Sequence, residues 1–220
     1  MKKSIILLIA GLLILPLAVS ARNDWANYVR YAAENAKVTK APKAVLMGDS
    51  ITDSWPGADR EFFESNNFIG RGISGQVTNQ MLLRFRQDVV ELNPEYVVIL
   101  AGTNDIAGNS GEISLDKVFN NIVTMCDIAK ANKIKPVICS VLPASRFGWN
   151  PKVTDCAEKI VQLNSMLQEY AKANKIRYVD YHSAMKNEQG GLSADLAGDG
   201  VHPTKKGYQI MEALLVKVVK

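Results

Sequence analysis

Histidine and cysteine are scarce in this chain, which has two histidines and three cysteines among its 220 residues. An odd number of cysteines cannot pair completely within one chain, so at least one thiol has no intramolecular partner. Cys126 and Cys139 fall in apolar patterns, and no C-x-x-C pair occurs. We therefore expect buried free thiols. A disulfide that involves Cys156 is the alternative, because the chain also starts with features of an export signal.

The chain also lacks a strong net charge. Its formal charge of +4 at pH 7 falls to +2 without Lys2 and Lys3, and the remaining lysines are scattered along the sequence. Proteins that bind nucleic acids usually gather their basic residues on one face or stripe, often with aromatic residues between them. We therefore expect no nucleic-acid partner.

One apolar run, over residues 5–17, stands near the start of the chain and has the features of a secretory signal. Two lysines precede it, and Val19-Ser20-Ala21 is a small-residue cleavage site. The run is too short to favour a retained membrane anchor, and no cysteine follows it as in a bacterial lipoprotein. We predict a signal peptide over residues 1–21 and a single periplasmic or secreted domain over residues 22–220. An uncleaved anchor is the alternative.

Short apolar runs alternate with segments of helical periodicity along the rest of the chain. Continuous apolar runs bounded by glycine or proline are typical of strands that are buried on both faces of a sheet. The predicted strands cover residues 44–47, 67–73, 96–101, 136–142 and 177–180. The predicted helices cover residues 81–92, 115–129, 160–170 and 208–218. This alternation predicts an α/β fold with a five-stranded parallel sheet and helices on both sides.

Polar and glycine-rich segments follow the first three predicted strands. In open α/β sheets, ligands bind beyond the carboxyl ends of the strands. Gly48 allows a sharp turn where the first strand ends, so Ser50 can begin a helix with its backbone N–H directed at a developing oxyanion. Asp49 is expected to form hydrogen bonds within this turn rather than to act as a catalyst.

Two further hydrogen-bond donors are predicted at the same edge of the sheet. Gly75 can bring a bare backbone N–H close to a substrate, and Asn104 offers a side-chain amide at the end of the third strand. Together with the N–H of Ser50, they make three donors for a tetrahedral oxyanion. An ordinary turn glycine and a loop-capping amide are the alternatives for these two residues.

A serine nucleophile needs an imidazole to take its proton and a carboxylate to orient that imidazole. Asp199 and His202 are three residues apart, a spacing that puts both side chains on one side of a single turn. The carboxylate can then bind one ring nitrogen and leave the other for Ser50. His182 is the competing histidine, and we favour His202 because its acid is better placed.

Four segments together resemble the sequence blocks of the SGNH (GDSL-type) hydrolases, in the order of that family. They are Gly48-Asp49-Ser50, Gly72-Ile73-Ser74-Gly75, Gly102-Thr103-Asn104-Asp105 and Asp199-Gly200-Val201-His202-Pro203. The glycine block and Arg84 are most similar to the branch related to platelet-activating-factor acetylhydrolases and carbohydrate acetylesterases. Ile51 stands where the family usually has leucine, which is a mild apolar exchange.

The resemblance implies a flavodoxin-like three-layer α/β/α sandwich and a serine esterase. It implies Ser50 as the nucleophile, His202 as base and then acid, and Asp199 as the residue that orients the imidazole. Gly75 and Asn104 would join Ser50 in an oxyanion hole. The resemblance implies no catalytic metal and no cofactor.

Two other classes of protein remain as alternatives. Residues 70–75 match G-x-G-x-x-G, the phosphate-binding pattern of dinucleotide-binding folds, but they follow the second strand and the expected acidic residue is missing from the end of the next one. A non-catalytic carbohydrate-binding module on the same fold is the other alternative, and it would be expected to lack some of the reactive residues.

The substrate is predicted from what surrounds the site. No long insertion is available for a lid or a deep acyl tunnel, so we expect a small acyl group, above all acetyl. Trp55, Trp149 and Phe147 follow the first and fourth strands, and we expect these aromatic residues to border the site and to offer a surface on which a sugar can stack; ordinary packing is the alternative. The partner is then a small-molecule or glycan ester, with a lysophospholipid or thioester as the second choice.

Overall fold

The computed structural model describes residues 24–219, so the predicted signal peptide over residues 1–21 lies outside the described residues. A five-stranded sheet forms the centre of the fold, with the strand order β2-β1-β3-β4-β5 and every pair parallel. The strands are β1 Ala44–Gly48, β2 Phe68–Gly72, β3 Tyr96–Leu100, β4 Lys135–Cys139 and β5 Arg177–Val179. This is the flavodoxin-like order, and it confirms the predicted fold class.

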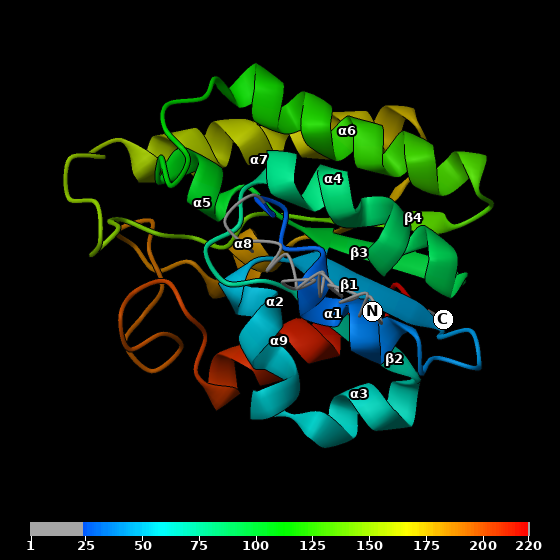
Figure 1. The fold of residues 1–220 in the computed structure, drawn as a ribbon. Coiled ribbons are helices and arrows are strands. Elements are labelled where there is room, and N and C mark those ends of the chain that lie inside the picture. Colours follow the sequence, from blue (N-terminus) through cyan, green and yellow to red (C-terminus); the bar gives the residue numbers. More distant parts are fainter. Residues whose placement is uncertain (1–23, 220) are drawn as a thin grey trace, which may run out of the picture.

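Helices cover both faces of the sheet and make three layers (Figure 1). The helices are α1 Val29–Asn35, α2 Ser50–Ala58, α3 Arg60–Asn66, α4 Thr78–Asp88, α5 Thr103–Ile106, α6 Leu115–Ala131, α7 Cys156–Ala173, α8 Tyr181–Met185 and α9 Lys205–Leu215, with a 3₁₀ turn, η2, at Val90–Leu92. Alternate residues of a strand point to opposite faces. Val45 and Met47 of β1 therefore pack in the core with α4, α6 and α7, whereas Ala44 and Leu46 pack in the core with α2, α3 and α9.

The fourth strand is shorter than predicted. It ends at Cys139, although Val141 and Leu142 are buried and were expected to continue it. The backbone leaves the sheet here because the side chain of Asn164, in α7, binds both polar groups of Val141, accepting from its N–H at 2.7 Å and donating to its carbonyl at 3.0 Å. Burial alone therefore did not mark the end of this strand.

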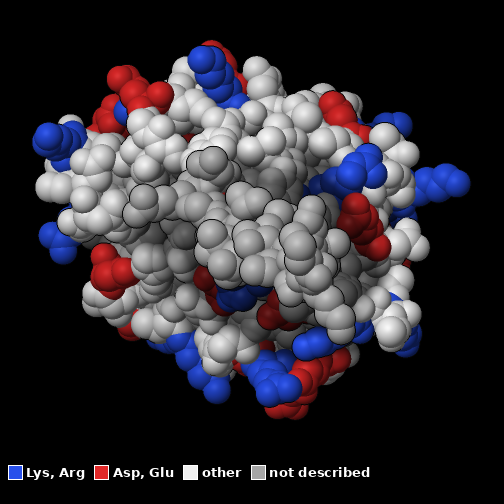
Figure 2. Space-filling view, in the orientation of Figure 1, with Lys and Arg blue, Asp and Glu red and all other residues white. Residues whose placement is uncertain are grey.

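Charges of both signs are interspersed on the face of the molecule seen in Figure 2. Several charged residues form surface ion pairs, including Lys43 with Glu95 at 2.7 Å and Lys206 with Asp195 at 2.6 Å. In the part of the chain that the structure describes, no helix combines the length and the apolar character that a membrane span needs.

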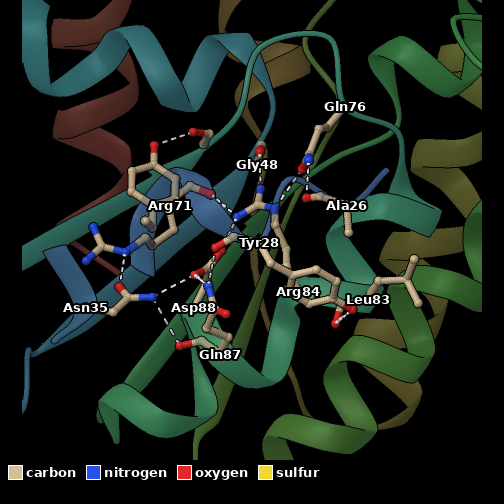
Figure 3. Close-up of polar contacts among 12 residues, drawn as sticks. Ala26, Tyr28, Asn35, Gly48, Arg71, Gln76, Leu83, Arg84, Gln87 and Asp88 are labelled. Atoms are coloured by element: carbon tan, nitrogen blue, oxygen red, sulfur yellow. Dashed lines mark hydrogen bonds and ion pairs between the residues drawn. The ribbon is translucent and has the colours of Figure 1, made fainter. Parts of the chain in front are cut away.

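The carboxyl ends of β1, β2 and β3 are level with one another, since Gly48 is paired with Gly72 on one side and with Leu100 on the other. Arg84 of α4 ties two of these ends together from inside the fold (Figure 3). Its buried guanidinium donates to the carbonyls of Gly48 and Arg71 and to the side chain of Gln76, and it forms an ion pair with Asp88 at 2.9 Å. The turns that follow β1 and β2 are thereby held at fixed positions.

Candidate active site

Ser50 is the first residue of α2, and a single residue, Asp49, separates it from the end of β1. The side chain of Asp49 caps this helix, because its Oδ1 accepts from the N–H of Ile51 at 3.0 Å, which confirms the structural role predicted for Asp49. Gly48 is required here because a Cβ at this position would lie 2.1 Å from Thr52 Oγ1 and 2.8 Å from the carbonyl oxygen of Leu100. The tight turn therefore brings the Ser50 side chain to the edge of the sheet.

The structure brings Ser50, His202 and Asp199 into one hydrogen-bonded series. Ser50 Oγ lies 2.8 Å from His202 Nε2, and His202 Nδ1 lies 2.6 Å from Asp199 Oδ2. An ionised carboxylate can only accept, so Nδ1 carries the proton and donates to Asp199. The lone pair of Nε2 then faces the Ser50 hydroxyl, which is the tautomer that general-base catalysis needs.

Asp199 is held by the turn that it begins. Its other carboxylate oxygen accepts from the backbone N–H of Val201 at 2.9 Å and of His202 at 2.8 Å. Gly200, between Asp199 and Val201, has a φ of +83°. Burial raises the pKa of Asp199, but the hydrogen bonds from the His202 ring and from these two N–H groups outweigh it and lower that pKa to about 2. The carboxylate is thus ionised at neutral pH.

His182, the competing histidine, lies in α8 and is buried. Its backbone N–H donates to Ser140 Oγ at 2.8 Å. The imidazole that contacts Ser50 is that of His202. The last helix begins just after His202, where the hydroxyl of Thr204 caps α9 by accepting from the N–H of Gly207.

The predicted oxyanion residues lie beside Ser50, around one shallow hollow of about 360 Å³. The hollow is lined by Ser50, Ser54, Ser74, Gly75, Asn104, Asn109, Trp149 and His202. Gly75 has a φ of +79°, which favours glycine, and apart from its chain neighbours none of the described residues has an atom within 4 Å of the point where its Cβ would be. Asn104 is the second residue of α5, and its Nδ2 donates one hydrogen bond to the carbonyl of Gln76 at 3.1 Å. Within residues 24–219, this amide nitrogen has no second acceptor, so its other N–H is available to a ligand.

The expectation that Trp55 borders the site is wrong. Trp55 is 1% exposed, donates from Nε1 to Glu212 at 2.9 Å and stacks on Tyr208 and Phe62 in the core. Successive helical residues are turned by about 100°, so a residue five positions after Ser50 faces away from the site and towards the interior. Sequence proximity to the serine was misleading for this reason.

Trp149 does reach the site, and it is 46% exposed. Its ring centroid lies 6.3 Å from that of His202. Phe147 was also expected at the edge of the site, but it is fully buried. Its ring packs against that of Trp149, with the two ring centroids 5.2 Å apart. Of the three aromatic residues singled out in the sequence, Trp149 thus offers a surface to a ligand.

Three residues near the site were missed in the sequence. Asp53, one helical turn after Ser50, accepts from both the N–H and the hydroxyl of Ser74 in the glycine-rich loop. The hydroxyl of Tyr31 donates to the carbonyl of Gly72 from the other side. Asn109 donates to Asn104 and accepts from Trp149. Asp53 could have been found from the sequence, because it stands three residues after Ser50 and so lies on the same side of the predicted helix. Tyr31 and Asn109 lie outside the four sequence blocks.

The G-x-G-x-x-G match at residues 70–75 has an explanation in packing. A Cβ at Gly72 would lie 2.1 Å from the backbone nitrogen of Asp53, so this glycine lets β2 approach α2. The match also starts within β2 and runs past its end, rather than following β1. Among the described residues, no group of three or more His, Cys, Asp or Glu side chains is placed to hold a metal ion.

Comparison with known proteins agrees with this geometry. The model of the GDSL-like lipase/acylhydrolase family matches residues 46–210. A solved GDSL-like lipase from Bacteroides thetaiotaomicron is 49% identical, with a TM-score of 0.85 over 88% of this chain and 97% of that one. An isoamyl acetate-hydrolyzing esterase from Saccharomyces cerevisiae is 25% identical over 81% of this chain and 86% of its own. An acetylxylan esterase from Xylanibacter ruminicola is 26% identical over 61% of this chain, which spans 30% of that protein.

Proposed function

The chain belongs to the GDSL-like lipase/acylhydrolase family and is a hydrolytic enzyme, and from this premise we propose that it removes short acyl groups, above all acetyl, from carbohydrate esters. One observation carries the catalytic part of the proposal: the hydrogen-bonded series from Asp199 through His202 to Ser50, which ends in an open hollow. The dinucleotide-binding and non-catalytic alternatives do not explain this series.

In the proposed mechanism, Ser50 Oγ attacks the ester carbonyl while His202 Nε2 takes its proton. The negative charge that develops on the carbonyl oxygen is stabilised by the N–H groups of Ser50 and Gly75 and by the amide of Asn104. The tetrahedral intermediate then expels the alcohol, which takes a proton from His202, and leaves an acyl group on Ser50. Water, deprotonated by His202, attacks this acyl-enzyme, and the acid leaves as Ser50 regains its proton.

The shape of the hollow supports a small acyl group. It is open and holds about 360 Å³, most of the residues that line it are polar, and Trp149 is among them. An exposed indole is a suitable surface for stacking on a sugar ring. Two relatives are named for acetate esters, one as an isoamyl acetate-hydrolyzing esterase and one as an acetylxylan esterase. These features favour an acetylated carbohydrate over a lysophospholipid or a thioester.

The direct test compares hydrolysis of p-nitrophenyl acetate, butyrate and octanoate, acetylated xylo-oligosaccharides and lysophosphatidylcholine by the parent enzyme and by Ser50→Ala. We expect the acetate esters to be preferred. Loss of Ser50 should lower kcat by several orders of magnitude, because the members of such a triad act as a unit. Ser165→Ala, on the exposed side of α7, is the control for an ordinary serine.

Two results would contradict the proposal in different ways. Undiminished hydrolysis by Ser50→Ala would remove Ser50 from its role as the nucleophile. Faster turnover of octanoate or lysophosphatidylcholine than of acetate would leave the nucleophile in place and overturn the proposed substrate class.

We also propose that the enzyme is exported, on the basis of the charged start, apolar core and cleavage site within residues 1–21. The full chain, expressed with its own N-terminus in a bacterial host and recovered from the periplasm or medium, should then begin at Arg22. An intact N-terminus in the membrane fraction would favour the uncleaved anchor instead.

A further inference from the structure

Asn109 lies in the loop that follows α5, outside the four sequence blocks, yet its side chain contacts three parts of the site. Its Oδ1 accepts from the indole N–H of Trp149 at 2.9 Å. Its Nδ2 donates to Asn104 Oδ1 at 2.9 Å and to the carbonyl of Gly75 at 3.3 Å. One amide therefore joins the exposed aromatic ring to both residues that accompany Ser50 in the proposed oxyanion hole.

The direction of these hydrogen bonds follows from the chemistry of the partners. An indole N–H can only donate, so it must meet the oxygen of the Asn109 amide. The nitrogen of Asn109 then faces Asn104 and Gly75, and Asn104 must present its oxygen to Asn109. The Asn104 nitrogen is then turned away from Asn109 and donates to the carbonyl of Gln76, and Asn104 is one of the residues that line the hollow.

The backbone of this loop holds Asn109 in the position that these contacts need. The N–H of Asn109 donates to the carbonyl oxygen of Asn104 at 3.0 Å, which closes the chain over α5. Gly108, just before it, has a φ of +73° and permits the turn. The side chain of Asn109 is thereby brought back over the residue that it orients.

We propose that Asn109 is a positioning residue that keeps the Asn104 amide turned with its nitrogen towards the reacting carbonyl, and that it transmits contact at Trp149 to this amide. The inference rests on the proposed function. An Asn104 amide turned the other way would present an oxygen to the oxyanion and repel it. A sugar that stacks on Trp149 would cover the exposed Asn109 side chain and shield its hydrogen bonds from water, so the alcohol part of the substrate would affect kcat as well as binding.

The test is a double-mutant cycle between Asn109→Ala and Asn104→Ala, with kcat and KM measured on an acetylated xylo-oligosaccharide. We expect Asn104→Ala to lower kcat by about 10²–10³. Asn109→Ala in the parent should lower kcat by about 10–100-fold, with KM changed much less, because a small misplacement of a catalytic group has effects of this size. In the Asn104→Ala background, Asn109→Ala should have almost no further effect, since the amide that it orients is gone.

Asn150→Ala is the matched control. The Asn150 side chain donates to the carbonyl of Ala107 in the same part of the chain at 2.8 Å, but no hydrogen bond joins it to Asn104 or Gly75 in the described structure. Asn150→Ala should loosen this segment without removing a hydrogen bond to the Asn104 amide. It should therefore lower kcat by the same factor in the parent and in the Asn104→Ala background. An equal factor for Asn109→Ala in both backgrounds would overturn the proposal and leave a merely structural role.

Trp149→Phe is a second variant that keeps the aromatic ring and removes its N–H. We expect a smaller loss of kcat that disappears in the Asn104→Ala background, and this result is informative even if Asn109→Ala does not fold. An undiminished kcat for Trp149→Phe would overturn the link from the indole. A separate measurement tests the proposed function itself: if the parent and Ser50→Ala hydrolysed this substrate at equal rates, the proposed function would be wrong, whatever the effect of Asn109→Ala.

Discussion

At the scale of single residues, two aspartates near Ser50 have pKa values displaced in opposite directions. Hydrogen bonds outweigh burial at Asp199 and lower its pKa to about 2. Asp49 is fully enclosed, and burial raises its pKa to about 7, although the N–H of Ile51 and the nearby His202 act in the opposite sense. Asp199 thus serves as the ionised partner of the imidazole, whereas Asp49 is a buried cap of helix α2.

The raised pKa of Asp49 makes stability depend on pH. The folded state holds this proton more tightly than the unfolded chain, in which an aspartate has its ordinary pKa of about 4. The stabilisation by the bound proton is complete below pH 4 and is lost as the pH rises to about 7, by on the order of 4 kcal/mol. An asparagine side chain at this position would keep an oxygen for the N–H of Ile51 without this titration.

We therefore expect Asp49→Asn to gain stability relative to the parent as the pH rises from 4 to 7. Urea unfolding of both proteins at several pH values measures this difference, and other titrating groups cancel in the comparison. A difference in unfolding free energy that stays constant over this range would contradict the expectation.

At the scale of elements, α4 links the sheet to the glycine-rich loop through Arg84. The Arg84–Asp88 pair is buried within one helix, one turn apart, and three further donors of the guanidinium bind the carbonyl groups of Gly48 and Arg71 and the side chain of Gln76. Removing one partner of a buried ion pair leaves the other charge without compensation. The position of α4 on the sheet therefore depends on the hydrogen bonds and ion pair of Arg84 as well as on the apolar side of the helix.

Arg84→Met should lower the unfolding free energy by about 3–5 kcal/mol, because Asp88 would stay buried without its cation. Urea unfolding at neutral pH measures the loss. Arg86→Met, on the exposed side of the same helix, is the control and should change stability by less than about 1 kcal/mol. Equal, small effects of the two variants would contradict a role for Arg84 in holding the strand ends.

At the scale of the whole molecule, two apolar cores on either side of the sheet stabilise the fold without disulfides among the described residues. Cys126, Cys139 and Cys156 are all buried and free, which confirms the expectation of unpaired thiols over the alternative disulfide. Burial raises the pKa of Cys126 and of Cys139 to about 12, so neither is a reactive thiolate at neutral pH.

Thiol titration with and without reductant tests this arrangement. Three thiols should react in denaturant whether or not the protein has been reduced, and the native protein should react slowly. The melting temperature should be the same in both conditions. Fewer than three thiols in the unreduced, denatured protein would indicate a disulfide that this structure lacks.

Much of the architecture was predictable because it depends on local patterns. Short apolar runs marked all five strands, and the glycines after them marked the carboxyl edge where Ser50, Gly75 and Asn104 meet. The end of β4 was not predictable, since it depends on the side chain of Asn164 in another helix. The short helices α1, α3, α5 and α8 were also missed, because they lack a long apolar periodicity.

The amino-acid sequence by itself determined the alternation of strands and long helices along the chain, the three polar segments that follow the first three strands and the close pairing of Asp199 with His202. The tertiary structure decided which side chains face one another across those segments: it turned Trp55 into the core, left Trp149 at the edge of the hollow and brought Asn109 between Trp149 and Asn104. Periodicity and spacing describe neighbours along the chain. The rotation of a helix on its sheet and the meeting of distant loops depend on how the whole core packs.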